Sequence, residues 1–371
     1  MKQFGKPSIY IWQRPDWPDF KWNQEIVDEV LNKAVHSHGI LLGKMSTVGL
    51  YEKNKSILAS LTDELVKSSE IEGEFLNAES VRSSIARKLG IKENNLLKED
   101  YYVEGLVDVI LDALGNCKKP LSAERIFEWH TCLFPYGKSG MYRITVGDWR
   151  KGPEAMQVVS GAMGFEKVHF EAPPSAQIDS LMNDFISWCN STTLHPLIAS
   201  AVSHLWFVTI HPFDDGNGRI ARTISDYFVA KIEQNFSRFF SISSEINRNK
   251  KQYYNILEAT QKGDLEVTEW ICTFLTFIES AINRAIESFD VIIKKSVFWE
   301  KYHNIEINER QRKIINRLLD GFEGKLTSSK WAKICHCSQD TALRDINDLI
   351  SKSLLSKTSE GGRSANYILN S

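Results

Sequence analysis

Apolar residues recur at the spacing of one helix face through much of the first third of the chain. Two runs, over residues 26–31 and 58–66, follow this period, and it continues over 78–114 with an interruption around 90–95. These patterns predict helices. The first 25 residues hold three Trp and three Pro, too many breakers for a long regular element, and they predict an extended arm packed across its own domain.

A different pattern occupies residues 137–174, which hold most of the Gly and Pro of the middle of the chain. Two β-prone pieces, 157–159 and 167–170, predict a hairpin or flap that projects from a helical body. Helical periods resume at residue 176 and run to about 291, with breaks at Pro196 and Pro212. The body of the protein is therefore expected to be mainly α.

Three domains are expected: a helical N-terminal domain over 1–117, a central domain over 118–302 and a C-terminal domain over 303–371. The last contains two short helical patterns, a third that Ser338 opens as a good N-cap, a Gly-rich turn and a short strand at its end. This order resembles a winged helix-turn-helix.

Composition narrows the class of protein. The 371 residues are 42% hydrophobic and 25% charged, which excludes a wholly disordered, collagen-like or coiled-coil chain. The net charge of −2 gives no general argument for a nucleic-acid or membrane partner. Neither a signal peptide nor an apolar run of 18 residues is visible, so we expect a cytoplasmic protein without a membrane partner.

The densest chemistry lies in residues 211–222, HPFDDGNGRIAR. Gly216, Asn217 and Gly218 form a tight turn that enters a helix, so backbone N–H groups and the positive end of the helix meet at an anion site suited to phosphates. Arg219 and Arg222 are three residues apart, on one face of that helix, where they can bind two phosphate groups.

Two further residues complete the site. Asp215 supplies a hard oxygen ligand suited to Mg²⁺ held against phosphates. His211 is the group there that can take a proton near neutral pH. The combination predicts phosphoryl or nucleotidyl transfer. A structural glycine turn with a core histidine is the alternative.

The same twelve residues match the HPFx[D/E]GNGRxxR signature of the Fic domain, and the resemblance extends over about residues 118–290. It implies a mainly α Fic-fold core with a β-hairpin flap, and an enzyme that transfers AMP from ATP to a hydroxyl side chain of a target protein and to itself. His211 would deprotonate the attacking Ser, Thr or Tyr hydroxyl, and Asp215 would hold Mg²⁺ between the α- and β-phosphates.

The remaining roles follow from the same resemblance. The amides of Gly216, Asn217 and Gly218 would cradle the phosphates, with a side-chain contact from Asn217, and Arg219 and Arg222 would neutralise the outer phosphates.

Two other segments would surround the substrates. The flap would register the backbone of the target as an added strand; its residues are Val168, His169, Phe170 and Glu171. The adenine and ribose would lie against Tyr253, Tyr254 and Gln261, although several relatives have Asn where Gln261 stands. Core packing is the alternative for the two tyrosines.

An inhibitory motif is expected far upstream. Ser68, Glu72 and Gly73 fit the family pattern [S/T]xxxE[G/N]. The resemblance implies that Glu72, within the ATP site, pairs with Arg222 and displaces the γ-phosphate, and that Ser68 braces the same helix. In some relatives the same glutamate positions water for AMP removal, which remains an alternative activity.

The C-terminal domain leaves two partners open. A DNA reader would use Gln339, Thr341, Arg344 and Arg363, which would make the protein a nucleotide-sensing transcriptional regulator. The domain carries 11 basic and 8 acidic residues, which is a weak charge excess for DNA binding and favours protein contact or a homodimer. The sequence gives neither the target protein nor the signal that relieves inhibition.

Overall fold

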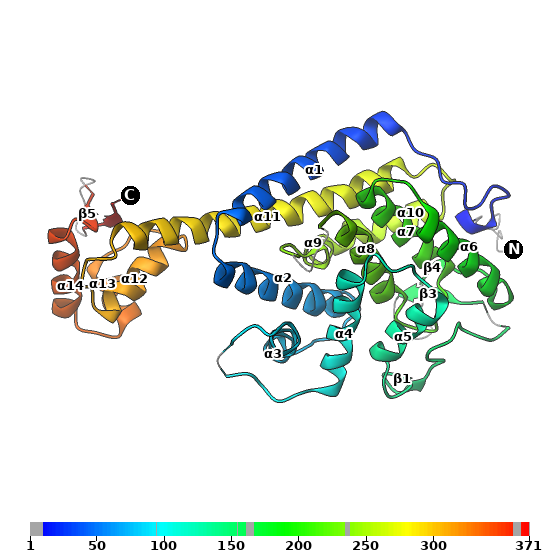
Figure 1. Cartoon of the computed structure of the whole chain (residues 1–371), viewed down its shortest axis with the longest axis horizontal. Helices are drawn as coiled ribbons and strands as arrows, with labels where there is room; N and C mark the ends of the chain where they lie inside the picture. Colours follow the sequence, from blue (N-terminus) through cyan, green and yellow to red (C-terminus); the bar gives the residue numbers. More distant parts are fainter. Residues whose placement is uncertain are drawn as a thin grey trace, which may run out of the picture. The chain divides into compact units, whose positions relative to one another are not determined.

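The computed structural model describes residues 10–93, 95–153, 155–160, 167–233, 238–358 and 365–370. It divides into two compact units, Met1–Ala285 and Ile286–Ser371, and α11 (Thr268–Lys301) contributes to both. The prediction of a mainly α protein is confirmed (Figure 1). Arg363 lies outside the described residues. Among the described residues no helix is both long and apolar enough to cross a membrane.

The N-terminal part of the first unit is a series of helices: α1 (Gln24–Ser46), α2 (Leu50–Ile71), α3 (Ala78–Leu89) and α4 (Tyr101–Gly115). They occupy the segments that the apolar periods predict. Asn77 and Asp100 accept backbone N–H bonds at the starts of α3 and α4, which explains why the chain re-enters a helix at these residues. One face of α2 packs on α3 and α9 (Ile242–Arg248).

The centre of this unit is the pair α7 (Pro196–Ile210) and α8 (Asn217–Glu233). Every residue of α7 from Leu197 to Ile210 is buried, as expected for a helix that is apolar on all faces. Around the pair lie α5 (Ala123–Leu133), α6 (Ile178–Ser191) and α10 (Lys250–Gln261). The two predicted proline breaks are confirmed: Pro196 opens α7 and Pro212 follows its end.

The segment predicted as a flap forms two small antiparallel hairpins, β1 (Lys138–Ser139) with β2 (Tyr142–Arg143), and β3 (Gln157–Ser160) with β4 (Lys167–Glu171). A register shift between Val158 and Val159 interrupts the second hairpin. The short helix η2 (Ser175–Gln177) then leads into α6.

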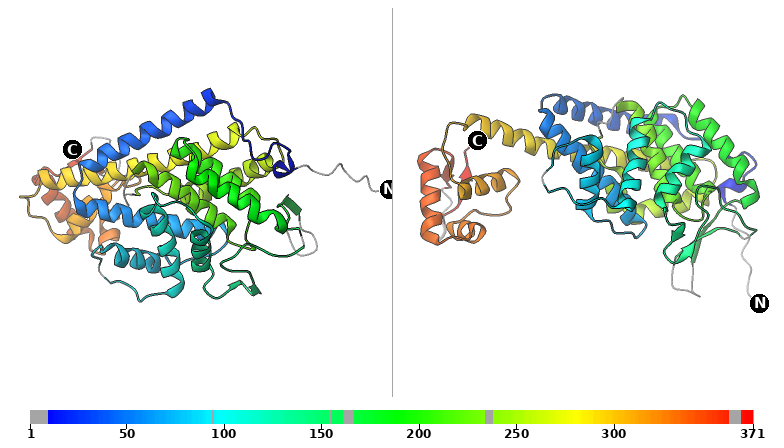
Figure 2. Two further views of the ribbon diagram at one scale, coloured as in Figure 1. Left: turned by 45° about the vertical axis from the view of Figure 1, so that its right-hand side comes forward. Right: turned by 60° about the horizontal axis from the view of Figure 1, so that its bottom comes forward.

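The N-terminal arm packs on residues of the predicted central domain, 118–302, whereas the sequence predicts packing across its own domain, 1–117. After the short helix η1 (Ile11–Gln13), it lies at the same end of the unit as the β3–β4 hairpin (Figure 2). The Trp12 indole donates a 2.7 Å hydrogen bond to the Glu171 carbonyl, and Arg14 donates to the Gly263 carbonyl at 2.8 Å. The arm therefore ties the flap to the loop after α10.

The second unit contains α12 (Glu309–Leu319), α13 (Ser328–Cys335), α14 (Gln339–Ser351), β5 (Leu355–Lys357) and β6 (Tyr367–Leu369). Its core includes Ile314, Trp331 and Ile346. Ser338 accepts a hydrogen bond from the Thr341 N–H, so the predicted N-cap of α14 is confirmed. The strands β5 and β6 pair antiparallel after the helices.

Candidate active site

The backbone turns sharply at His211, which follows α7 in the left-handed conformation (φ +52°) that few non-glycine residues adopt. Its Nδ1 lies 3.1 Å from the Val208 carbonyl oxygen. Because a carbonyl oxygen only accepts, Nδ1 carries the proton of the neutral ring and Nε2 keeps its lone pair. Burial lowers the pKa of His211 to about 4, so the ring is neutral at pH 7. His211 is thus a neutral imidazole with a basic Nε2.

Arg150, which sequence analysis did not identify, stabilises this turn through hydrogen bonds to its backbone carbonyls. Its Nε donates to the His211 carbonyl at 2.8 Å, and its backbone N–H donates to the Pro212 carbonyl at 2.8 Å. The same guanidinium also donates to the Pro173 carbonyl. The side chain is buried, and it joins the start of the loop to the end of the flap.

The loop between His211 and α8 is closed by Asn217. Its side-chain oxygen accepts from the Phe213 N–H at 2.9 Å, and its amide nitrogen donates to the Phe213 carbonyl at 2.8 Å. The buried side-chain amide of Asn217 thus bonds to the loop backbone through both its oxygen and its nitrogen. Gly216 has φ +84°, and a Cβ there would lie 2.8 Å from the Phe134 ring. The glycine is needed for both reasons.

Asp215 lies at the rim of this loop, partly exposed. One carboxylate oxygen accepts the Gly216 N–H at 2.6 Å, and the other accepts the Ser139 hydroxyl from β1. The Asp215 carbonyl oxygen accepts from His130 Nε2 at 3.0 Å. In the described part of the chain, His, Cys, Asp and Glu side chains form no cluster of three or more suited to a metal. A metal here would need further ligands from its substrate.

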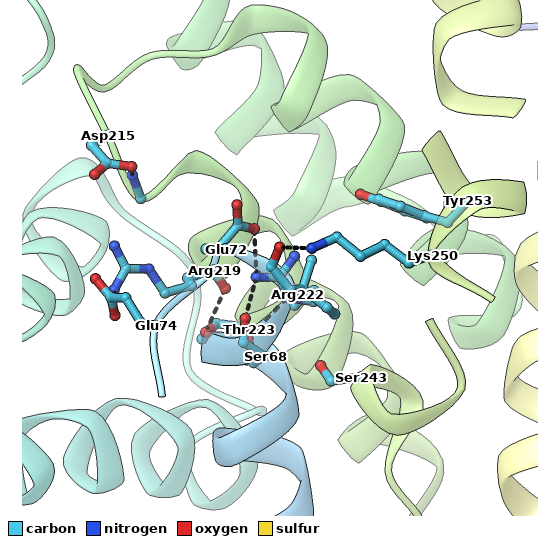
Figure 3. Close-up of polar contacts among 12 residues, drawn as sticks. Ser68, Glu72, Glu74, Asp215, Arg219, Arg222, Thr223, Ser243, Lys250 and Tyr253 are labelled. Atoms are coloured by element: carbon cyan, nitrogen blue, oxygen red, sulfur yellow. Dashed lines mark hydrogen bonds and ion pairs between the residues drawn. The ribbon is translucent and has the colours of Figure 1, made fainter. Parts of the chain in front are cut away.

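Arg222 is buried and paired with the end of α2 (Figure 3). Its Nη2 lies 2.7 Å from Glu72 Oε1, and its Nε and Nη2 donate to the hydroxyl and carbonyl of Ser68, both at 2.9 Å. The Glu72 carboxylate lies over the first turn of α8, where a Cβ on Gly218 would come within 2.2 Å of it. Glu72 therefore occupies space beside the predicted anion site.

Arg219 is occupied as well, by residues that sequence reasoning missed. Its Nη1 lies 2.7 Å from Glu74 Oε2 and 3.2 Å from the Tyr102 hydroxyl. The Tyr102 hydroxyl in turn donates to Glu74 Oε2 at 2.8 Å. The guanidinium lies over the Phe134 ring, 4.8 Å from its centroid. No local pattern pointed to Glu74 or Tyr102, because their partner lies more than 100 residues away.

A cavity of about 650 Å³ opens beside these groups. Its lining includes Glu72, His211 and Gly218, together with the residues predicted to bind adenine and ribose, Tyr253, Tyr254 and Gln261. Tyr253 and Gln261 are buried, and their side chains form hydrogen bonds within the core. The Tyr253 hydroxyl lies 2.8 Å from His204 Nε2, and the Gln261 amide donates to the Thr209 hydroxyl at 3.2 Å. Tyr254 is 39% exposed. Lys250, also in the lining, donates to the Ile71 carbonyl at 2.6 Å.

The β3–β4 hairpin forms another wall of the cavity. His169 Nδ1 lies 2.6 Å from Glu258 Oε2, which ties the flap to α10. Hydrogen bonds from Lys262 and from His169 lower the pKa of Glu258 to about 2, so this carboxylate is charged at neutral pH. Phe170 is buried against Tyr10, whereas Val168 is exposed. Exposure thus falls along β4, from Lys167 and Val168 in solvent to Phe170 in the interior.

Two family models match this chain. Residues 120–229 match the Fic/DOC family, and residues 10–91 match a domain of unknown function, DUF4172. A protein adenylyltransferase Fic of Nematostella vectensis is 22% identical over 278 residues, which cover 72% of this chain and 56% of that protein. A probable protein adenylyltransferase of Aquifex aeolicus is 26% identical over 121 residues, covering 32% of this chain and 35% of the other. The chain therefore spans little more than half of the first relative.

A solved structure shares the fold. A Fic family protein from Desulfovibrio desulfuricans has a TM-score of 0.54 at 18% identity, and the match covers 94% of this chain and 97% of that one. At this identity the likeness shows the fold alone.

Proposed function

Because its central domain and its relatives support a Fic-family protein, we propose that this chain is a protein adenylyltransferase that moves AMP from ATP to hydroxyl side chains of target proteins. The observation that carries the proposal is one cavity lined by the neutral His211, by Gly218 at the start of α8 and by Glu72, whose carboxylate pairs with the buried Arg222 of that helix. A base, an anion site and cations for phosphates are what nucleotidyl transfer requires.

The reaction follows from these positions. His211 Nε2 accepts the proton of a Ser, Thr or Tyr hydroxyl on the target, and the oxygen attacks the α-phosphorus of ATP. The bond from the α-phosphorus to the bridging oxygen breaks, and pyrophosphate leaves with the electron pair. The proton on Nδ1 stays with the Val208 carbonyl, which fixes the ring in the tautomer that can act as base.

The phosphates are proposed to lie at the N-terminus of α8, against Arg219 and Arg222. Asp215 would hold Mg²⁺ there, and the ion would supply positive charge against the phosphate oxygens. A single carboxylate fits this role, since Mg²⁺ in nucleotide sites takes one or two protein carboxylates and completes its shell with phosphates and water. The adenine ring of ATP would lie farther along the cavity, against Tyr254.

Glu72 is proposed to inhibit this reaction. Its carboxylate is bound to Arg222 and lies over the first turn of α8, where it repels the outer phosphates of ATP. ATP then binds with its α-phosphorus out of line for attack, and a small misalignment of reacting atoms can cost on the order of 10²-fold in rate.

The target would add a strand to the β3–β4 hairpin, because a two-stranded sheet offers outer edges to which an extended peptide can bind. For the second unit we propose a protein-contact role. Two of its basic residues are neutralised there, Arg310 by Asp345 and Lys352 by Asp348, each at 2.7 Å. This leaves less free positive charge for a DNA backbone.

Intact-mass spectrometry of the Glu72→Gly protein with Mg²⁺ and ATP tests the proposal. We expect a mass gain of one AMP or more, at a rate about 10²-fold above that of the unaltered protein, because loss of the carboxylate lets ATP align. Adding His211→Ala should abolish the gain, because the base is lost.

Glu70→Gln is the matched control, since Glu70 lies two residues before Glu72 on α2 and pairs with Lys67. It should leave the basal rate unchanged. Absence of any AMP adduct on the Glu72→Gly protein or on added protein targets, while ATP still binds, would contradict the proposed activity.

A further inference from the structure

The end of α2 carries two carboxylates into the site, one on each side of Gly73. Gly73, at φ +84°, donates its N–H to the Glu70 carbonyl, and the Glu74 N–H donates to the Ser69 carbonyl, both at 3.0 Å. This pair of bonds is the Schellman cap that commonly ends a helix at glycine. Because backbone bonds make the cap, it holds residues 72 and 74 in one rigid turn whatever their side chains do.

The turn aims its two carboxylates at the two arginines of α8. Glu72 reaches Arg222 and Glu74 reaches Arg219, each at 2.7 Å, as Figure 3 shows. Both guanidinium side chains are at most 5% exposed, whereas the two glutamate side chains are 30% and 39% exposed. The arginines are thus fixed parts of the core, and the glutamates are the partners that can leave.

Arg219 is held more completely than a single ion pair would hold it. The Tyr102 hydroxyl accepts from Arg219 and donates to Glu74, so the three groups form a closed set of hydrogen bonds. Burial raises the pKa of Tyr102, which keeps the phenol protonated and able to donate. The ring of Phe134 covers the guanidinium from another side.

We propose that Glu74 is a second inhibitory carboxylate, which holds Arg219 away from phosphate while Glu72 holds Arg222, so that the cap segment 72–74 restrains both arginines together. The inference rests on the proposed function of this site. A triphosphate must displace both carboxylates before both arginines can bind it. Its apparent affinity is therefore reduced by the fraction of molecules in which the segment has moved away.

The consequence is that Glu72→Gly releases only half of the restraint. Gly73 still ends the helix, and Glu74 still meets Arg219 in that variant. Glu74→Gln removes the charge but keeps a hydrogen-bonding side chain, and the cap does not depend on it. This variant is expected to fold normally.

Binding of Mg²⁺-ATP, measured by calorimetry on proteins that also carry His211→Ala, tests the inference without turnover. Against the Glu72→Gly protein, the protein with both Glu72→Gly and Glu74→Gln should bind ATP about fivefold more tightly, because a partly exposed ion pair to Arg219 no longer competes. Tyr102→Phe should tighten binding about twofold by opening one bond of the set. Glu70→Gln should change nothing.

Unchanged or weaker ATP binding after Glu74→Gln overturns the inference. So does equal tightening by Glu70→Gln, because the effect would then be one of general charge. Failure of the proposed function looks different: the Glu74 variant would bind ATP more tightly, while proteins that retain His211 would form no AMP adduct. If none of these proteins binds ATP, both proposals are wrong.

Discussion

Two residues one turn apart on α8 form ion pairs of contrasting kinds. Arg222 is buried, and its partner Glu72 is 30% exposed. Asp226 pairs at 2.6 Å with Arg238, which lies beyond the end of α8, and both side chains are at most 4% exposed. Arg238 also donates to the Phe240 carbonyl at 2.8 Å and stacks on the Phe240 ring.

The contrast separates a permanent ion pair from a removable one. When both partners are buried, separating them leaves an uncompensated charge in the core, which is costly. When one partner is exposed, it can exchange its arginine for water, and a phosphate can take its place. Burial of one partner only is what an exchangeable contact requires, and Glu74 with Arg219 repeats this arrangement.

The largest expected effect tests the permanent pair. Asp226→Ala should destabilise the first unit by about 3–5 kcal/mol, because removing one partner of a buried ion pair is strongly destabilising. Urea denaturation followed by tryptophan fluorescence measures this. Glu29→Ala, which removes an exposed carboxylate paired with Lys33, is the control and should leave the midpoint unchanged. Equal midpoints for the two variants would show that burial does not distinguish the pairs.

The pH dependence of AMP transfer tests the Arg222 site alone, because the start of α8, and not the Asp226–Arg238 pair, adjoins His211. Burial lowers the pKa of His211 to about 4, so the imidazole stays neutral, and able to act as base, above that pH. In the Glu72→Gly protein, kcat/KM for AMP transfer should be level from pH 8 to 5 and fall about tenfold per unit below about pH 4. A fall beginning near pH 6.5, the ordinary range of histidine, would contradict the assignment.

The smallest expected effect concerns Ser68, which accepts from Arg222 Nε at 2.9 Å. Ser68→Ala should loosen Arg222 and raise basal AMP transfer only about two- to fivefold, because Glu72 and the Ser68 carbonyl still hold Arg222 after this one bond is lost. Rates of AMP incorporation measure it. Ser46→Ala, on an exposed hydroxyl at the end of α1, is the control. A rate equal to that of Glu72→Gly would place the restraint in Ser68 instead.

The sequence predicts the elements of the fold and the residues of one contiguous loop, but not the site residues that come from distant elements. The helices of the core and the strands of the flap follow from apolar periods and β-prone runs, because local spacing decides them. The loop from His211 to Arg222 is contiguous, so its chemistry is readable in one segment. Arg150 and Tyr102 gave no such signal, since each acts on a partner from a distant element and resembles an ordinary helix or loop residue locally.

Glu74 could be predicted from the sequence only in part. It lies next to the predicted inhibitory motif, yet its role depends on which way the chain turns after Gly73, and φ is not readable from the residue type. The motif predicts a phosphate contact for Asn217, whose side chain also closes the loop on Phe213. The sequence does not predict this second role, because it depends on the Phe213 backbone groups that the buried amide meets in the folded loop.

The arm described at the outset also sets an order of assembly during synthesis. Trp12 pairs with Glu171, 159 residues later in the chain, whereas Arg14 and Asn23 pair with Gly263 and Thr268, about 245 residues later. The bond between Glu72 and Arg222 spans 150 residues, and Arg222 is made after Glu171 and before Gly263. On the nascent chain this ion pair can therefore form after the arm meets the flap and before the bonds from the arm to Gly263 and Thr268 close. Synthesis thus places the pairing of Arg222 between two stages of arm docking.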